Sequence, residues 1–436
     1  MIRFLCAAVL GVLFAGTAAA VDIREVTSPG GIRAWLVEEH SIPFTALELR
    51  FEGGTSLDRT GKRGAVLLMT ALIEEGAGDF DSQSFAAARD ALAAEFSFDA
   101  FDDAMTISAQ MLSENRAEAV ELLRVALNQT RFDQSAIDRV RGQIISMIQS
   151  EAKDPGDIAN RAFDRAAFGD HPYGSARTGT LESVAALTRD DLMAAKSDVM
   201  TKDRLTVSAV GDITEAELGE LLDILLGNLP ADGASMPALV KPALTGGVTT
   251  IDYASPQSVV VFGHKGIRRD DPDFFAAYLL NQILGGRGFG ARLMEEVREK
   301  RGLTYGIGTY LAPMNLSETW QGSFSSANEK VAEAIDVVRA EWARAAAEGV
   351  SAEELETAKT YLTGSYPLRF DGNGPIANIL VGMQSEGLPI SYVNDRNAYI
   401  EAVTVDDIKR VAAQRMKVED LRFVVVGQPV GLDTGN

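Results

Sequence analysis

The spacing of apolar residues along the first half of the chain predicts strands and helices in alternation. Leu47, Leu49 and Phe51 fall on one face of a segment with period two, which is typical of a half-buried strand. A strand before it, at 33–37, follows the turn Pro29-Gly30-Gly31. Further strands are expected at 104–111 and 205–210. Helical spacing predicts helices at 65–73, 84–96, 116–128, 134–153, 158–168, 189–199 and 215–226.

The pattern breaks over residues 231–247 and then restarts. This segment holds Pro237, Pro242 and several glycines, so we expect a linker there. It separates an N-terminal domain, 21–230, from a C-terminal domain, 248–436. In the second domain we expect strands at 258–262, 319–325 and 421–426. Its helices are expected at 274–284, 291–300, 330–347, 352–370, 376–385, 393–402 and 406–416.

A short internal repeat indicates that the two halves are homologous. Thr188-Arg189-Asp190-Asp191-Leu192 opens a helix that leads into a buried strand ending at Gly211. Thr404-Val405-Asp406-Asp407-Ile408 opens a second such unit ending at Gly427, and 404 − 188 and 427 − 211 both equal 216. Each threonine is a suitable N-cap for its helix. With a linker near the midpoint, this spacing favours duplication of one ancestral unit.

The first twenty residues are expected to be a secretory signal peptide and not part of the fold. Residues 1–20 contain one basic residue, Arg3, then an apolar run, and end in Ala18-Ala19-Ala20, an A-x-A cleavage site. A membrane anchor is the alternative, although the apolar run is short for a span. Cys6 is the only cysteine, so the mature chain would contain neither disulfides nor thiol chemistry. These features predict a periplasmic protein with no membrane span after signal removal.

Composition narrows the classes of partner. The formal net charge is −21 over 436 residues, which argues against nucleic-acid binding. Such acidity tolerates basic peptides better than acidic ones, and it also serves solubility. The apolar fraction of 46% is ample for packed cores in a chain of this length.

The stretch Asn281–Tyr310 carries the most distinctive candidate chemistry. Glycines at 285, 286, 288 and 290 precede the helix at 291–300, which Gly302 should end before a strand-like segment near Leu303. Arg298 then lies on the last helical turn and Tyr305 at the start of the strand. Both donate hydrogen bonds, so together they suit a peptide carbonyl or a developing oxyanion. Taken alone, however, an arginine there also suits the helix dipole, and the tyrosine suits packing.

The whole stretch resembles the pitrilysin, insulysin and mitochondrial processing peptidase family of zinc peptidases. In that family a glycine turn leads into a helix of the pattern S-R-L-F-x-x-L-R-x-x-x-G-L-x-Y, and its Arg and Tyr bind substrate and assist catalysis. The resemblance implies those roles for Arg298 and Tyr305. It also implies an α+β fold of two homologous halves, each an antiparallel sheet backed by helices, closing on a peptide as a clamshell. Three further places carry it: Pro172-Tyr173-Gly174 with Gly179, Val207–Gly211, and Gly387-Leu388-Pro389 with Tyr392 running into Ala402-Val403-Thr404.

The family's zinc site is missing from this sequence. The motif H-x-x-E-H, in which two His bind zinc and the Glu activates water, belongs on the first long helix. Here those positions fall on Val66, Met69 and Thr70, and the third ligand, about seventy-six residues further on, falls on Ser146. The three histidines are not spaced as ligand pairs and are expected in loops or turns: His40, His171 and His264. No metal site and no cofactor are therefore expected in this chain.

The N-terminal half lacks the zinc motif, whereas the C-terminal half has both the Arg and the Tyr. This combination resembles one kind of subunit in heterodimeric members of the family. The resemblance implies a subunit inactive alone, whose Arg298 and Tyr305 act in trans at the zinc of a homologous H-x-x-E-H partner during peptide hydrolysis. The alternative is a catalytically inert peptide-binding or scaffold homologue. A homodimer with another chemistry is a third interpretation. Glu74 and Glu75 after the first helix are expected to be surface charge, and 285–290 lacks the G-x-G-x-x-G phosphate-loop pattern.

Overall fold

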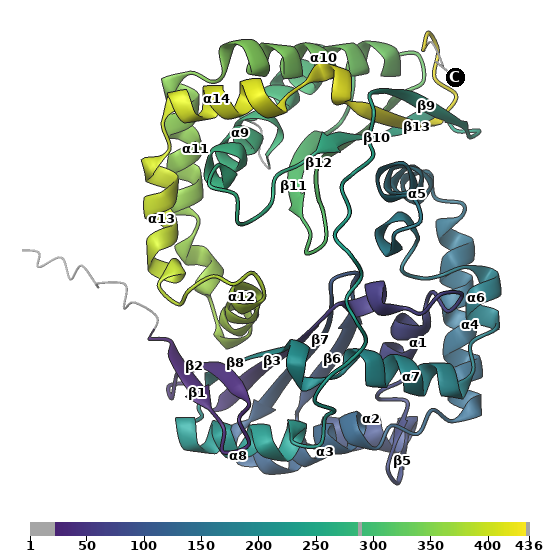
Figure 1. The fold of residues 1–436 in the computed structure, drawn as a ribbon, viewed down its shortest axis with the longest axis vertical. Helices are drawn as coiled ribbons and strands as arrows, with labels where there is room; N and C mark the ends of the chain where they lie inside the picture. Colours follow the sequence, from purple (N-terminus) through teal and green to yellow (C-terminus); the bar gives the residue numbers. More distant parts are fainter. Residues whose placement is uncertain (1–21, 287–289, 433–436) are drawn as a thin grey trace, which may run out of the picture.

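The structure is a computed structural model, and it describes residues 22–286 and 290–432. The predicted signal peptide, 1–20, lies outside these residues, as does part of the glycine turn at 285–290. Two halves lie one above the other, each a sheet with helices packed on it, and an extended segment joins them (Figure 1). That segment, 228–246, contains no helix or strand.

The N-terminal half is built on a six-stranded sheet in the order β1-β2-β8-β3-β7-β6. All neighbours pair antiparallel except β2 and β8, which are parallel. Leu47, Leu49 and Phe51 of β3 point toward the helices and are essentially inaccessible, as their spacing predicts. The strands are β1 (Arg24–Thr27), β2 (Arg33–Glu38), β3 (Phe44–Glu52), β6 (Glu95–Ala100), β7 (Ala104–Leu112) and β8 (Leu205–Gly211).

The C-terminal half repeats this topology. Its sheet has the order β11-β12-β10-β13-β9, and again one pair, β13 with β9, is parallel. Setting β9 against β2 and β13 against β8 also pairs β10 with β3, β12 with β7 and β11 with β6, and the edge strand β1 has no counterpart. Apart from β1, the topology agrees with two homologous halves. The strands are β9 (Gly247–Asp252), β10 (Gln257–Lys265), β11 (Ile307–Pro313), β12 (Glu318–Ala327) and β13 (Arg422–Gly427).

Helices back the outer face of each sheet and enclose one large apolar core per half. The helices of the first half are α1 (Ala65–Ala71), α2 (Ser82–Ala91), α3 (Arg116–Asn128), α4 (Gln134–Glu151), α5 (Pro155–Phe168), α6 (Leu181–Ala185), α7 (Arg189–Val199) and α8 (Glu215–Leu226), of which α5 does not pack on its own sheet. In the second they are α9 (Phe274–Gly285), α10 (Val331–Glu348), α11 (Ala352–Gly364), α12 (Asn373–Ser385), α13 (Tyr392–Ala402) and α14 (Val405–Arg415). A short ribbon, β4 (Gly76–Ala77) and β5 (Phe80–Asp81), joins α1 to α2.

One helix of each half packs on the sheet of the other half. Helix α5 lies against β10 and β13, where Phe163 is buried with Val261 and Val424. Helix α12 lies against β3 and β8, where Leu380 is buried with Val210. In Figure 1 both helices stand between the two sheets, at opposite sides of the molecule. This exchange joins the halves more firmly than the linker alone would.

Several expected elements differ from the structure. The helix expected at 84–96 ends at Ala91, because Ala93 takes a positive φ of 47° and the chain enters strand β6. The helix expected at 352–370 ends at Gly364, and the 3-10 turn η6 (Pro367–Phe370) follows, since Pro367 cannot continue an α-helix. Strand β9 begins at Gly247, the last residue assigned to the linker from sequence.

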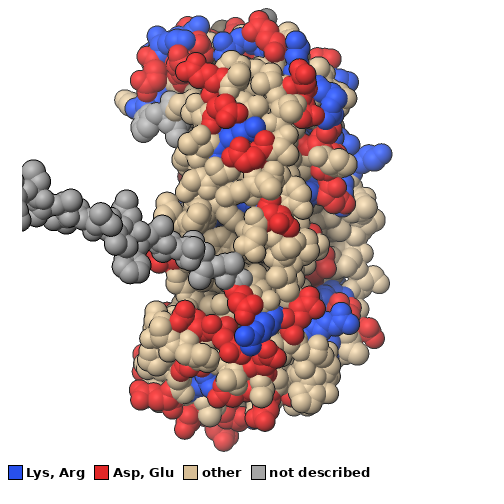
Figure 2. All heavy atoms as spheres, turned by 90° about the vertical axis from the view of Figure 1, so that its left-hand side faces the viewer, with Lys and Arg blue, Asp and Glu red and all other residues tan. Residues whose placement is uncertain are grey.

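The surface carries the net negative charge unevenly. On the face shown in Figure 2, acidic side chains predominate at the lower end, in the N-terminal half, while uncharged residues fill the middle. Among the helices in the described part of the chain, none combines the length and apolar character needed to cross a bilayer.

Candidate functional site

Arg298 lies on a helical turn of unusual geometry. The segment expected as an α-helix over 291–300 is a π-helix, η5 (Met294–Glu299), over most of its length. π-Helical turns are rare and are often found at functional sites. The Arg298 side chain is one-third exposed, and its Nη1 donates to Glu299 Oε1 at 2.7 Å. Gly302 then ends the segment with a φ of +59°, a conformation that glycine adopts without strain.

Tyr305 lies on a turn that is anchored on both sides. The strand expected near Leu303 begins only at Ile307, so Tyr305 precedes β11 and is not part of it. The neighbouring Thr304 is buried, and its hydroxyl donates to Ser325 O at 2.7 Å and accepts from Gly306 N at 3.1 Å. Leu303 N also donates to Val297 O at 2.9 Å. These bonds hold the backbone on which Tyr305 is displayed.

The Tyr305 side chain itself is 89% exposed. It makes no hydrogen bond or ring contact with another residue in the described part of the chain, so it is not joined directly to Arg298. A large aromatic residue that is fully displayed on a fixed turn contributes little to packing. Its hydroxyl is available to a ligand or to a second protein.

The positions of the missing zinc motif lie inside the N-terminal core. On α1, Val66 and Met69 are inaccessible and Thr70 is 2% exposed. The Thr70 hydroxyl has no hydrogen-bond partner among the described residues. Ser146, the aligned third position, is on α4 and donates to Gly142 O at 2.9 Å. Within residues 22–286 and 290–432, no group of three or more His, Cys, Asp or Glu side chains is arranged to hold a metal ion.

The three histidines have separate structural partners. His40 Nδ1 contacts Asp212 at 2.8 Å, and His171 Nε2 contacts Ala238 O at 3.1 Å. His264 was expected in a loop or turn, and this prediction is wrong. It lies on strand β10, where it is 2% exposed. Its Nδ1 contacts Lys265 O at 2.7 Å, and its Nε2 accepts from Trp342 Nε1 at 3.1 Å. Burial lowers the pKa of His264 to about 4, so the ring stays neutral at physiological pH.

Two carboxyl groups between the sheets have raised pKa values. Glu48, on the face of β3 that α12 covers, accepts from the Ser108 hydroxyl at 2.7 Å, and burial raises its pKa to about 7. Asp164, on α5, has a pKa raised to about 7 by burial, with a smaller contribution from Asp102. Each is half protonated near neutral pH, which is the state that acid–base chemistry requires. Structural burial produces the same shift, and neither group was singled out from the sequence.

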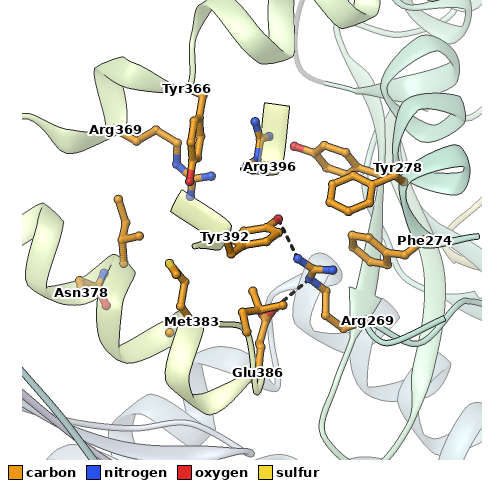
Figure 3. A pocket seen from close by; sticks show the side chains of 14 residues that line it. Arg269, Phe274, Tyr278, Tyr366, Arg369, Asn378, Met383, Glu386, Tyr392 and Arg396 are labelled. Carbon is orange, nitrogen blue, oxygen red and sulfur yellow. Dashed lines mark hydrogen bonds and ion pairs between the residues drawn. The ribbon is translucent and has the colours of Figure 1, made fainter. Parts of the chain in front are cut away.

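A cavity of about 310 Å³ was also missed from the sequence. It lies between the start of α9, the turn η6 and the helices α12 and α13, and arginine and aromatic side chains line it (Figure 3). A sequence pattern that could have indicated the cavity was present. Phe274, Phe275 and Tyr278 stand at i, i+1 and i+4 on α9, which gathers more aromatic surface at one helix end than a core face needs.

The fold and these positions define a class: a two-half clamshell protein of the peptidase type whose first half holds no zinc motif. Comparison with known families agrees. Residues 33–181 match the family model "Insulinase (Peptidase family M16)", and residues 186–362 match "Peptidase M16 inactive domain". The chain belongs to peptidase family M16, and its match to the family's inactive domain covers residues 186–362. The resemblance stated from sequence is therefore confirmed, and so is the two-half fold.

The most informative relatives are proteins of similar length. A "Non-peptidase homolog YmxG" of Helicobacter pylori is 24% identical over 427 residues, covering 98% of each chain. The beta subunit of the mitochondrial processing peptidase of Blastocladiella emersonii is 27% identical, covering 73% of this chain and 70% of that protein. A crystal structure of a peptidase M16 inactive domain from Pseudomonas fluorescens superposes with a TM-score of 0.87 at 28% identity, covering 95% of this chain and all of that one.

Proposed function

We propose that this chain is the non-zinc subunit of a periplasmic heterodimeric metallopeptidase. In this proposal Arg298 and Tyr305 reach a peptide bound at the zinc of a homologous H-x-x-E-H partner. Tyr305 donates to the oxyanion of the tetrahedral intermediate, and Arg298 holds a substrate carbonyl or carboxylate. The zinc belongs to the partner, and the localisation rests on the signal peptide predicted at 1–20.

One observation carries the proposal: Tyr305 is 89% exposed on an anchored turn, and its hydroxyl has no partner in the described chain. The zinc positions of the same chain hold buried Val66 and Met69. An exposed hydrogen-bond donor in one half and no zinc motif in the other fit a site that is completed by another subunit.

A scaffold or peptide-binding role is the second candidate. It is supported by the similarity to the Helicobacter pylori protein, which is named a non-peptidase homologue. The chain also shares its fold, at a TM-score of 0.76 and 16% identity, with a chain of complex III from Candida albicans. In this role the clamshell would bind a peptide or another subunit without hydrolysis, and Arg298 and Tyr305 would be dispensable.

The first experiment is recovery of the tagged mature protein from its native periplasm, with mass spectrometry of what co-purifies. The proposal expects a stoichiometric protein of similar size that carries H-x-x-E-H. Recovery of the chain alone, as monomer or homodimer, would favour the second candidate.

The decisive experiment uses the reconstituted pair. Tyr305→Phe removes only the hydroxyl, and we expect kcat to fall by roughly 10²- to 10³-fold with KM little changed, as for loss of an oxyanion donor. Arg298→Ala should lower kcat/KM without unfolding the chain. Arg301→Ala is the matched control, because Arg301 lies in the same segment and pairs with Glu296 at 2.6 Å. Normal peptidase activity in both site variants would contradict the proposal.

A further inference from the structure

The cavity beside α9 is rich in arginine although the chain as a whole is acidic. Arg269, Arg369 and Arg396 line it, with Glu386 as the single carboxylate among the lining residues. The formal net charge of the chain is −21, so a concentration of positive charge is a local feature. Aromatic rings make up much of the remaining wall: Phe274, Phe275, Tyr278, Tyr366 and Tyr392.

Arg269 is a fixed part of the wall. Its Nε contacts Glu386 Oε2 at 2.9 Å and its Nη2 donates to the Tyr392 hydroxyl at 2.7 Å, as the dashed lines in Figure 3 show. Its guanidinium lies 4.4 Å from the centre of the Phe274 ring. The Glu386 carboxylate therefore compensates the charge of Arg269 and leaves the other two arginines uncompensated.

Arg396 is buried without a counter-ion. It is 6% exposed and lies between the rings of Tyr366, at 4.3 Å, and Tyr278, at 6.0 Å. Among the described residues, Nη1 alone of its nitrogens is hydrogen-bonded, to Leu362 O at 3.3 Å and Asn397 Oδ1 at 3.2 Å. Its Nε and Nη2 make no hydrogen bond, and no carboxylate lies within 4.0 Å, in the described part of the chain. A buried guanidinium in this state is stabilised strongly by an anion that reaches it.

Arg369 adds a second uncompensated charge at the same cavity. It lies on η6 and is exposed, and its side chain pairs with no carboxylate in residues 22–286 and 290–432. In Figure 3 it stands beside Tyr366, the ring against which Arg396 is stacked. The cavity thus offers two guanidinium groups from two different elements, together with flat apolar surface.

We propose that this cavity binds a carboxylate carried on an aromatic group, with Arg396 and Arg369 as its charge partners. Guanidinium groups bind carboxylates through paired hydrogen bonds, and an aromatic ring fits among the tyrosine and phenylalanine side chains. The volume of about 310 Å³ is at the small end of ligand pockets, which suits a group of about one ring. Two sources share this chemistry: a free aromatic acid and the C-terminus of a peptide ending in an aromatic residue. The inference does not depend on a partner subunit.

The test is calorimetry on the single full chain with three small probes and a tripeptide. N-acetylphenylalanine should bind, while N-acetylphenylalanine amide, which lacks the charge, and inorganic phosphate, which lacks the ring, should bind at least about tenfold more weakly. A tripeptide ending in phenylalanine, with its free and amidated forms compared, distinguishes the sources. Binding tighter than that of the acetylated residue identifies a peptide terminus, and weaker binding identifies a free acid.

Variants locate the binding. Arg369→Gln, at an exposed position, should weaken N-acetylphenylalanine about tenfold or more without affecting folding, and Arg396→Gln should do the same if its circular dichroism matches that of the wild type. Glu386→Gln removes the single acid and should tighten binding. Arg165→Gln is the control, because Arg165 is a 63% exposed arginine on α5, away from the cavity. Absence of binding to the wild type, or equal binding to Arg369→Gln, would overturn the inference.

Discussion

At the scale of single residues, Glu48 links burial to pH. Burial raises its pKa from 4.5 to about 7, and the hydrogen bond from Ser108 opposes this shift. The folded state therefore holds the proton more tightly than the unfolded state. Its contribution to stability is lost as pH rises from about 4.5 to about 7 and stays lost above that range.

Glu48→Gln should remove this pH dependence. The amide oxygen can still accept from Ser108, and no charge is buried at high pH. We expect the variant to be more stable than the wild type by about 1–3 kcal/mol at pH 8 and equally stable at pH 4, from urea unfolding at both pH values. Glu95→Gln, at an exposed position on the edge strand β6, should show no such difference. A stability difference for Glu48→Gln that is the same at both pH values would show that charge burial is not the cause.

At the scale of elements, the duplicated helix caps are a matched pair. The Thr188 hydroxyl accepts from Asp191 N at the start of α7, and the Thr404 hydroxyl accepts from Asp407 N at the start of α14, each within a capping box. Thr188→Ala and Thr404→Ala should each lower the free energy of unfolding by about 1 kcal/mol, because each removes the same orphan-donor bond. Urea unfolding measures both, and Thr→Ser at either site should restore most of the loss. Loss at one site only would indicate that the two caps are not equivalent.

Elements with both a cap and a clear period were predicted well from sequence. Helices α7 and α8 begin and end at the expected residues, because capping residues and apolar spacing agree there. Strand β6 was missed because Ala-rich sequence precedes it and only Phe96 and Phe98 mark its alternation. The π-helix around Arg298 was missed because periodicity over six residues does not distinguish it from an α-helix.

The site was predictable only in part. Arg298 and Tyr305 were identified through a family resemblance. The local sequence did not predict that Tyr305 would be 89% exposed and would precede β11. Their catalytic roles stay a prediction. The packing of α5 and α12 on the sheet of the opposite half could not be predicted from sequence. The apolar face of a helix shows that the helix is buried but not which sheet covers it. The same limit hid the cavity, whose arginines come from three separate segments, at 269, 369 and 396.

At the scale of the whole molecule, the tip of the β11–β12 hairpin clasps the N-terminal half. Leu316 N donates to the Tyr173 hydroxyl at 3.1 Å, and that hydroxyl in turn contacts the Asp103 carboxylate. Asn315 N donates to Asp103 at 3.1 Å, and the Asn315 amide donates to Glu52 at 3.1 Å. Tyr173 and Leu316 are both buried in a small apolar cluster. This clasp and the two exchanged helices hold the halves in the arrangement observed.

Tyr173→Phe tests whether the clasp sets how far the halves open. The change keeps the ring in its cluster but leaves Leu316 N and one Asp103 oxygen without their partner, at a cost of about 1–3 kcal/mol. Local opening should become more frequent, so hydrogen exchange at the Leu316 amide should speed up by roughly 5- to 150-fold, while amides in the cores of the two sheets stay unchanged. Tyr361→Phe is the matched control, because Tyr361 is 51% exposed on α11. Under the proposed function, the halves open to admit a peptide, so the same variant in a reconstituted pair should change the rate of substrate entry more than the chemical step. Uniformly faster exchange over the whole chain would instead show that Tyr173 supports global stability and not a clasp.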